Sequence, residues 1–360
     1  MVDTLVTGAA RRGERMTADL ARKVAFLRSV GALDHVVETV ETHMSWVFLT
    51  ADAAYKLKKP IRLPFLDFST VELRRQSCEQ ELRLGRRLAP DVYRAVVALV
   101  ETSSGLAIAR AGEPAPSTVV DWLVAMRRLP TERMLPQMLA RGMASGAHAD
   151  AVAELLAAFY RRTSRAPWDA AEYRRRTRTL VTTVGAELAA RGAPRAQLEP
   201  IVGRLLAAIE RAAPLLAARI AGGRVVDAHG DLRPEHVFLE SPPVIIDPLE
   251  FDDQLRMLDV ASELAFFTLE CERLGARWFA DRVTARHAEQ TGDDPAPELV
   301  AIYRTQHALT RAAIALRRLD DAPPADHERW RAKALDYLAR IATSGALVNG
   351  SPSSVVIERS

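Results

Sequence analysis

Two kinds of apolar pattern divide the chain near residue 130. Before Pro130, short runs of β-branched and aromatic residues lie between turn-forming segments. Beyond it, longer segments place apolar residues at three- and four-residue spacing. The first pattern is typical of β-strands and the second of amphipathic helices. We therefore predict mostly strands before residue 130 and mostly helices after it.

The part before residue 130 is expected to be a sheet with few helices. The predicted strands are residues 46–49, 53–59, 93–100, 106–110 and 119–129. One helix is predicted from Thr17, a candidate N-cap, to Gly31, a stop signal. A second short helix is predicted just before Glu41. A longer one begins after Ser69 or Thr70, either of which can cap it, and ends near Leu88.

The helices predicted after residue 130 share alanine-rich apolar faces bounded by Gly or Pro. They cover residues 136–143, 149–163, 170–191, 197–222, 258–275, 276–290, 297–319 and 325–343. We expect residues 1–15 to be disordered and the chain from Gly345 on to be a loose tail.

The segment from Val225 to Phe251 interrupts the helical pattern. It reads as a short strand, the polar loop His229-Gly230-Asp231, and a tight hairpin whose second strand ends on Asp247. Asp231 is then in a loop and Asp247 at a strand end. Two carboxylates held in this way suit phosphoryl transfer, in which one accepts the proton of an attacking hydroxyl and the other holds a metal ion.

Composition excludes several classes of protein. The chain has 360 residues, 48% of them hydrophobic and 26% charged, as in ordinary globular enzymes. A net charge of +3 indicates neither a nucleic-acid nor a membrane partner, and no apolar run is long enough to span a membrane. Cys78 and Cys271 are far apart and without metal-site spacing. We expect both to be reduced core thiols in a cytoplasmic protein.

The string HGDLRPEHVFL, followed by IID, resembles the catalytic loop and metal-binding aspartate of the aminoglycoside phosphotransferase family of small-molecule kinases. ETHMSWVFL, YKLKKP and FLDFST add to the resemblance. It implies an α+β, two-lobed protein-kinase-like fold, with a small antiparallel-sheet N-lobe and a mainly helical C-lobe. The implied parts are an N-terminal extension and helix (1–31), the N-lobe (32–129), the catalytic C-lobe (130–344) and a flexible tail (345–360).

The resemblance also implies roles around the catalytic loop. Asp231 is the expected base, Asp247 the magnesium ligand, and Arg233 a candidate to neutralise charge near the transferring phosphate. The family carries Asn five residues after the base, where this chain has His236. An imidazole can ligate a metal, but magnesium prefers oxygen. His236 is therefore expected either to ligate the metal or to hold the loop, with Glu250 as the alternative ligand.

In the N-lobe, the resemblance implies a lysine that grips the nucleotide phosphates and pairs with a helix glutamate. Lys56 and Lys58 share one face of their strand. Lys58, followed by Lys59-Pro60, is the first choice and Lys56 the second. The expected partner is Glu81, with Glu79 in reserve, and only one of the two lysines is expected to meet it.

Three further contacts to ATP are expected from the same resemblance. Ser45 is the phosphate-contact candidate, through its backbone amide and hydroxyl. Met126 to Leu129 form the hinge, where backbone groups meet adenine and Met126 lies against the ring. Asp259 is expected to anchor the catalytic loop.

The function implied is transfer of the γ-phosphoryl group of MgATP to a hydroxyl of a small molecule such as an amino sugar or aminoglycoside. The alternative is a nucleotide-binding pseudokinase or regulatory module, for which His236 is the sole sequence support. Residues 229–300 hold 16 acidic and six basic residues. That excess is either a solvated helical face or an acidic lip for a cationic substrate. The sequence leaves open the acceptor, the choice between ATP and GTP, and the oligomeric state.

Overall fold

The computed structural model describes residues 18–29, 31–33, 35–63, 66–109, 118–320 and 322–342. The chain divides into two compact units. The first comprises residues up to 141 together with 235–254, and the second comprises 142–234 and 255 onward. The expectations for residues 1–15, for Thr17 as an N-cap and for the tail from 345 lie outside the described residues.

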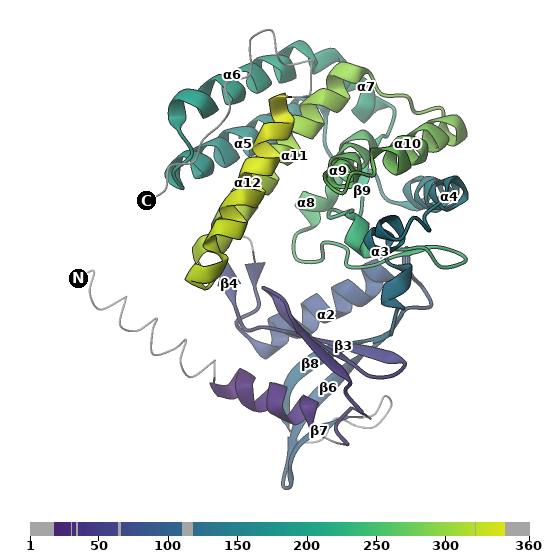
Figure 1. Cartoon of the computed structure of the whole chain (residues 1–360), viewed down its shortest axis with the longest axis vertical. Coiled ribbons are helices and arrows are strands. Elements are labelled where there is room, and N and C mark those ends of the chain that lie inside the picture. The colour runs from purple at the N-terminus through teal and green to yellow at the C-terminus, as the bar shows by residue number, and fades with distance from the viewer. Residues whose placement is uncertain are drawn as a thin grey trace, which may run out of the picture. The chain divides into compact units, whose positions relative to one another are not determined.

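The first unit is built on an antiparallel sheet (Figure 1), so the predicted small antiparallel-sheet part is confirmed. Its strand order is β1-β2-β3-β8-β6-β7. The strands are β1 (Glu38–Glu41), β2 (Ser45–Leu49), β3 (Ala53–Lys58), β6 (Tyr93–Thr102), β7 (Gly105–Ile108) and β8 (Thr118–Arg127). The short helix predicted before Glu41 is wrong. That segment is β1, because Thr39 and Val40 continue the sheet by pairing with Phe48 and Val47 of β2.

Two helices cover this sheet. A helix over residues 18–28 contributes Val24 and Leu27 to a core that also contains Phe48 and Leu57. Helix α2 (Val71–Gly85) packs against β6 and β8. Its N-cap is Thr70, whose hydroxyl accepts the backbone N–H of Leu73 at 3.2 Å. A short pair of strands, β4 (Arg62–Leu63) and β5 (Leu66–Asp67), precedes α2.

The first unit also includes two segments from beyond residue 130. One holds η1 (Thr131–Arg133) and α3 (Leu135–Ala140), and the other holds η2 (Pro234–His236), β10 (Val237–Phe238) and β11 (Val244–Ile245). The predicted hairpin that ends on Asp247 is therefore present. The backbone N–H of Leu239 donates to Arg133 O at 2.8 Å, and Met134 forms a β-bridge with Phe238. These contacts tie residues 131–141 to the first unit, whereas the sequence analysis placed its end at 129.

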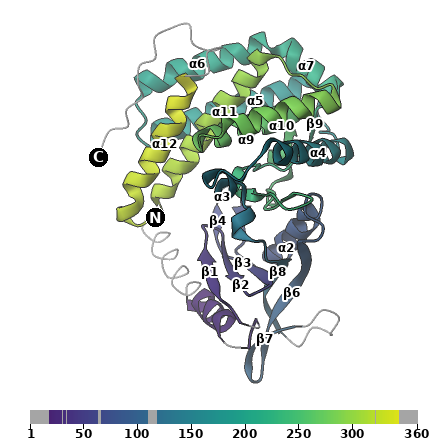
Figure 2. The ribbon, with the colours of Figure 1, turned by 45° about the vertical axis from the view of Figure 1, so that its right-hand side comes forward.

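The second unit is mainly helical (Figure 2), as predicted. Its helices are α4 (Gly146–Arg162), α5 (Ala170–Ala190), α6 (Arg195–Arg211), α7 (Ala213–Ala221), α9 (Val260–Arg273), α10 (Arg277–Thr291), α11 (Pro297–Arg317) and α12 (His327–Ala342), with short η3 (Arg318–Asp320) and η4 (Pro324–Asp326) between the last two. The single helix predicted over 197–222 is two helices, because Pro214 at the start of α7 has no N–H to continue α6.

A small sheet carries the catalytic-loop segment of the second unit. Strand β9 (Val225–Asp227) pairs antiparallel with β12 (Met257–Asp259), just after the short helix α8 (Asp253–Arg256). The Asp227 carboxylate accepts from the buried guanidinium of Arg256 at 2.7 Å. No helix in the described part of the chain is long and apolar enough to cross a membrane.

Candidate active site

Two lysines of β3 share one glutamate of α2 in the first unit. Lys56 Nζ lies 2.8 Å from one carboxylate oxygen of Glu81, and Lys58 Nζ lies 2.6 Å from the other. The prediction that only one lysine meets Glu81 is wrong, because a carboxylate offers an oxygen to each. Glu79, the reserve, is half-exposed and pairs with Arg75. The structure thus brings Lys56, Lys58 and Glu81 together.

The second partners of the two lysines differ. Lys58 Nζ contacts Glu250 at 2.5 Å, and its side chain is only 1% exposed. Lys56 Nζ contacts Asp247 at 2.5 Å, and its side chain is 14% exposed. Burial alone would lower the pKa of Lys56, but the carboxylates of Asp247, Glu81 and Glu250 raise it well above its usual value. Lys56 is therefore charged and lies beside the expected metal ligand, whereas Lys58 is enclosed.

Asp247 has an unusual backbone conformation. Its φ of 61° lies in the left-handed region, which costs a non-glycine residue about 1–2 kcal/mol. Its backbone N–H donates to the hydroxyl of the buried Tyr93 at 2.9 Å, which holds this conformation. Burial would raise the pKa of its carboxyl, but Lys56 and His236 lower it. The side chain is 43% exposed, so a charged carboxylate is presented to an incoming ligand.

His236 lies against the same carboxylate. Its Nε2 is 3.5 Å from Asp247 Oδ2, and the ring is buried. No group of three or more His, Cys, Asp or Glu able to hold a metal occurs among the described residues. Magnesium is usually held by one or two carboxylates together with phosphate oxygens, so the Asp247 carboxylate fits this ion better than the His236 imidazole does. Glu250 is already engaged by Lys58.

The remaining residues predicted to contact ATP are Ser45, Met126 and Leu129, and two of them belong to strands of the sheet. Ser45 is the first residue of β2 and is buried. Its backbone N–H donates to Thr42 Oγ1 at 2.9 Å, so of its two predicted phosphate contacts only the hydroxyl is left. Met126 is buried and pairs with Ala54 in the sheet. Leu129 follows the end of β8 and packs on the same core. Leu129 is therefore the better placed of the two to offer backbone groups to a base.

The loop that carries Asp231 is held by a residue that sequence reasoning missed. In the second unit, the carboxylate of Glu263 accepts the backbone N–H groups of His229 and Gly230 at 3.1 and 2.6 Å. The hydroxyl of Tyr160 also donates to it at 2.7 Å. Glu263 is buried in α9, so an acidic residue within the largely apolar segment Val260–Leu269 was the available signal.

The expectation that Asp259 anchors the loop is therefore corrected. Asp259 caps α9 by accepting the N–H of Ala261 at 2.9 Å, and it also accepts from Arg219 and from the Tyr303 hydroxyl. Its carboxylate is occupied by these partners, one helical turn before Glu263. Asp259 thus fixes the start of α9, and Glu263 on that helix fixes the loop.

The carboxylate of Asp231 faces two guanidinium groups. Arg233 Nε lies 3.1 Å from Oδ2, and Arg311 Nη1 of α11 lies 3.7 Å from Oδ1. The Asp231 side chain is 29% exposed, so it remains accessible. Arg233 was predicted beside Asp231, whereas Arg311 is 80 positions away in the sequence and carries no local signal.

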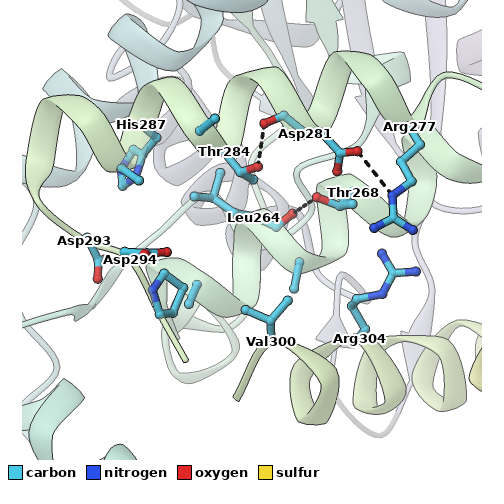
Figure 3. A pocket seen from close by; sticks show the side chains of 15 residues that line it. Leu264, Thr268, Arg277, Asp281, Thr284, His287, Asp293, Asp294, Val300 and Arg304 are labelled. Atoms are coloured by element: carbon cyan, nitrogen blue, oxygen red, sulfur yellow. Dashed lines mark hydrogen bonds and ion pairs between the residues drawn. The ribbon is translucent and has the colours of Figure 1, made fainter. Parts of the chain in front are cut away.

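The second unit also contains a pocket of about 370 Å³ between α9, α10 and α11 (Figure 3). Its wall includes Leu264, Thr268, His287, Val300 and Arg304. None of the site residues predicted from the sequence lines it. We assign it no part in the chemistry.

Comparison with known proteins identifies the family. Residues 66–298, more than half of the chain, match the phosphotransferase enzyme family. The chain belongs to this family. The matched residues include helix α2, which carries Glu81, and also the Asp231 loop and Asp247. Strand β3, which carries Lys56 and Lys58, precedes the matched residues. An uncharacterised protein of Mycobacterium tuberculosis and one of Mycobacterium bovis are each 31% identical over 329 residues, which cover 88% of this chain and 63% of the relative. This phosphotransferase-family chain therefore spans less than two thirds of those relatives.

Solved structures support the fold. A choline/ethanolamine kinase family protein from Mesorhizobium loti is 17% identical, with a TM-score of 0.52 over 93% of this chain and 95% of that one. The GDP complex of an aminoglycoside 2'-phosphotransferase-IIIa mutant is 14% identical, with a TM-score of 0.51 over 91% and 99%. At such identities the likeness speaks for the fold alone, and it confirms the predicted two-lobed, kinase-like architecture.

Proposed function

We propose that this phosphotransferase-family chain transfers the γ-phosphoryl group of MgATP to a hydroxyl group of a small molecule. The observation that carries the proposal is the continuous set of ion pairs from Glu81 through Lys56 to Asp247. A buried glutamate that orients a lysine beside an exposed carboxylate is an arrangement that phosphoryl-transfer enzymes use to grip phosphates.

In this proposal the first unit binds the nucleotide. Lys56, oriented by Glu81, contacts the phosphates, with the Ser45 hydroxyl as a further donor and Leu129 beside the base. Asp247 would hold magnesium, with His236 next to it, and the ion would neutralise charge on the β- and γ-phosphates. Lys58, enclosed by Glu81 and Glu250, holds β3 and α2 together.

The second unit supplies the base. The two backbone hydrogen bonds to Glu263 fix the loop, and Asp231 is then positioned to accept the proton of the acceptor hydroxyl. Arg233 and Arg311 favour the ionised form of that carboxylate, because opposite charges stabilise it. Catalysis in this scheme is mainly positioning and electrostatic stabilisation.

The decisive experiment measures ADP formation by the purified chain with MgATP and a panel of hydroxyl compounds that includes amino sugars and aminoglycosides. Asp231→Asn should retain the fold and the affinity for MgATP but lose turnover by about 10²- to 10⁴-fold, as expected on removal of a general base. Near-normal turnover by this variant at saturating acceptor would refute the role of Asp231. Tight MgATP binding with no turnover on any acceptor would favour the alternative, a nucleotide-binding module.

A further inference from the structure

The charge around Asp231 within the second unit bears on the acceptor. We infer that the acceptor is an anionic hydroxyl compound, one that carries a carboxylate or phosphate group, recognised by Arg311 of α11 and Lys333 of α12. This inference rests on the proposed function, because it concerns the substrate of the same site.

The first support is the set of cations that meet near the base. Arg233 and Arg311 face the two oxygens of Asp231. Burial, and then the positive charges of Arg311 and Arg273, lower the pKa of Lys333, which Arg233 also influences. Lys333 stands one turn before Tyr337 on α12, and the Tyr337 hydroxyl accepts from Arg311 Nε at 3.4 Å, so Lys333 adds to the positive potential beside Arg311. Such a potential attracts an anion and repels an amino-bearing substrate.

The second support is that the nearby carboxylates are already engaged. Glu270 accepts from the Tyr337 hydroxyl at 2.6 Å and from Arg273 at 3.1 Å. Asp336 accepts from Arg273 at 2.6 Å and from Arg340 at 3.0 Å. Each carboxylate oxygen of Glu270 and of Asp336 thus has a donor within the second unit. An ammonium group on a substrate would have to share these carboxylate oxygens with the donors already bound to them.

The third support is that two of the cations have capacity to spare. Arg311 stands 3.6 Å from Glu270 and 3.7 Å from Asp231, beyond the length of a charged hydrogen bond. Its hydrogen bond to the Tyr337 hydroxyl is also long, 3.4 Å from Nε to the oxygen. Lys333 has no ion pair with a described carboxylate, and its ammonium lies 5.5 Å above the ring of Trp330. The planar guanidinium of Arg311 suits a bidentate carboxylate or phosphate oxygen pair.

The shared ligand chemistry, an oxyanion, has two possible sources. One is the acceptor itself, and the other is the γ-phosphate of the nucleotide. If Arg311 and Lys333 bind the acceptor, substituting them changes the KM for the acceptor. If they bind the nucleotide, substituting them changes the KM for ATP.

The test compares gluconate, glucose and glucosamine, which share a six-carbon skeleton but differ in charge. A second series is glycerate, glycerol and 3-aminopropane-1,2-diol, which share a three-carbon skeleton. ADP formation is measured for the parent chain and for Arg311→Gln, Lys333→Gln and Arg329→Gln. Arg329 lies one turn before Lys333 on α12, is exposed, and serves as the matched control. We expect the carboxylated members to have the highest kcat/KM. Arg311→Gln and Lys333→Gln should each raise their KM about 10- to 100-fold, with the KM for ATP unchanged.

A second measurement needs no turnover. Because Trp330 lies beside Lys333, its fluorescence should change saturably with the carboxylated compounds, and Lys333→Gln or Trp330→Phe should abolish that change. Preference for an aminated compound, a rise in the KM for ATP alone, or no fluorescence response to any anion would each overturn the inference. The first two outcomes leave the proposed phosphotransferase intact, whereas loss of MgATP binding by the parent chain would reject the proposed function itself.

Discussion

At the scale of single residues, Lys56 and Lys58 are chemically identical and only two positions apart, yet the structure gives them different surroundings. Lys58 is enclosed between two carboxylates, with Phe68 5.1 Å from its ammonium. Lys56 reaches Asp247 and retains some exposure. Enclosure is suited to holding β3 and α2 together, and partial exposure is suited to meeting a ligand.

We therefore expect the two alanine variants to fail in different ways. Lys56→Ala should weaken MgATP binding while leaving the fold intact. Lys58→Ala should lower the free energy of unfolding by about 3–5 kcal/mol, because it leaves buried carboxylates without their cation. Calorimetric titration with MgATP and urea unfolding measure the two effects.

Lys59→Ala, which removes a cation paired with the exposed Glu41, is the matched control and should change neither quantity. The sequence-based order had Lys58 as the nucleotide lysine. A larger loss of MgATP affinity in Lys58→Ala than in Lys56→Ala would restore that order.

His236 is the other residue whose role is testable alone. If its imidazole ligates the metal beside Asp247, it should favour manganese over magnesium, since manganese accepts nitrogen ligands more readily. His236→Asn should then keep activity with magnesium and lower the ratio of the manganese to the magnesium rate, whereas His236→Ala should lose activity with both. An unchanged ratio in the Asn variant would make His236 a residue of loop structure.

At the scale of elements, helix α9 positions the loop that carries Asp231 within the second unit. Asp259 caps its first turn, and Glu263 in the next turn receives the loop's backbone N–H groups. The loop also turns at Gly230, whose φ of 87° is accessible to glycine at little cost. Any shift of α9 is therefore transmitted to Asp231.

Glu263→Ala should impair both stability and turnover. It leaves two backbone N–H groups and the Tyr160 hydroxyl without their acceptor, at a cost of about 1–3 kcal/mol for each buried group left unsatisfied. We expect a lower urea midpoint and a fall in kcat larger than the change in the KM for ATP. Tyr160→Phe, which removes only the hydroxyl, should show a small loss of stability and near-normal kcat. Equal kcat in Glu263→Ala and the parent would show that the loop keeps its position without this anchor.

At the scale of the whole molecule, buried histidines link stability to pH. His287 of α10 is buried against the ring of Tyr160, and burial lowers the pKa of its imidazole to about 4. In the unfolded chain the ring titrates near 6.5. The unfolded state thus takes up the proton first, and this contribution to stability is full above about pH 6.5 and decreases as the pH falls to about 4.

The free energy of unfolding should therefore decrease on acidification, and a substitution at His287 should make this decrease smaller. Between pH 7.5 and 5.5, His287 contributes a decrease of about 1 kcal/mol. His287→Phe, which preserves the aromatic contact with Tyr160, should remove that part of the decrease. Urea unfolding at the two pH values measures it, and an identical decrease in parent and variant would show that folding does not lower the pKa of His287.

The sequence by itself determined the elements and the chemistry-bearing loop. Local patterns were enough for the strands and most helices because apolar periodicity reports which face of an element is buried. The order His229-Gly230-Asp231 and the strand ending on Asp247 identified the candidate carboxylates, and period two placed Lys56 and Lys58 on one face. Where local signals were short, as at β1 and at the break before α7, the prediction failed.

Only the tertiary structure decided which partners these side chains meet. Three of these partnerships depend on contacts between distant parts of the chain. Glu81 bonds both lysines, and Glu263 rather than Asp259 holds the loop. Arg311 faces Asp231. The acidic excess of residues 229–300 left open either a solvated helical face or an acidic lip for a cationic substrate. Around Asp231 it is offset by Arg233 and by Arg311 of α11, because electrostatic potential depends on distance in space and not on distance along the sequence.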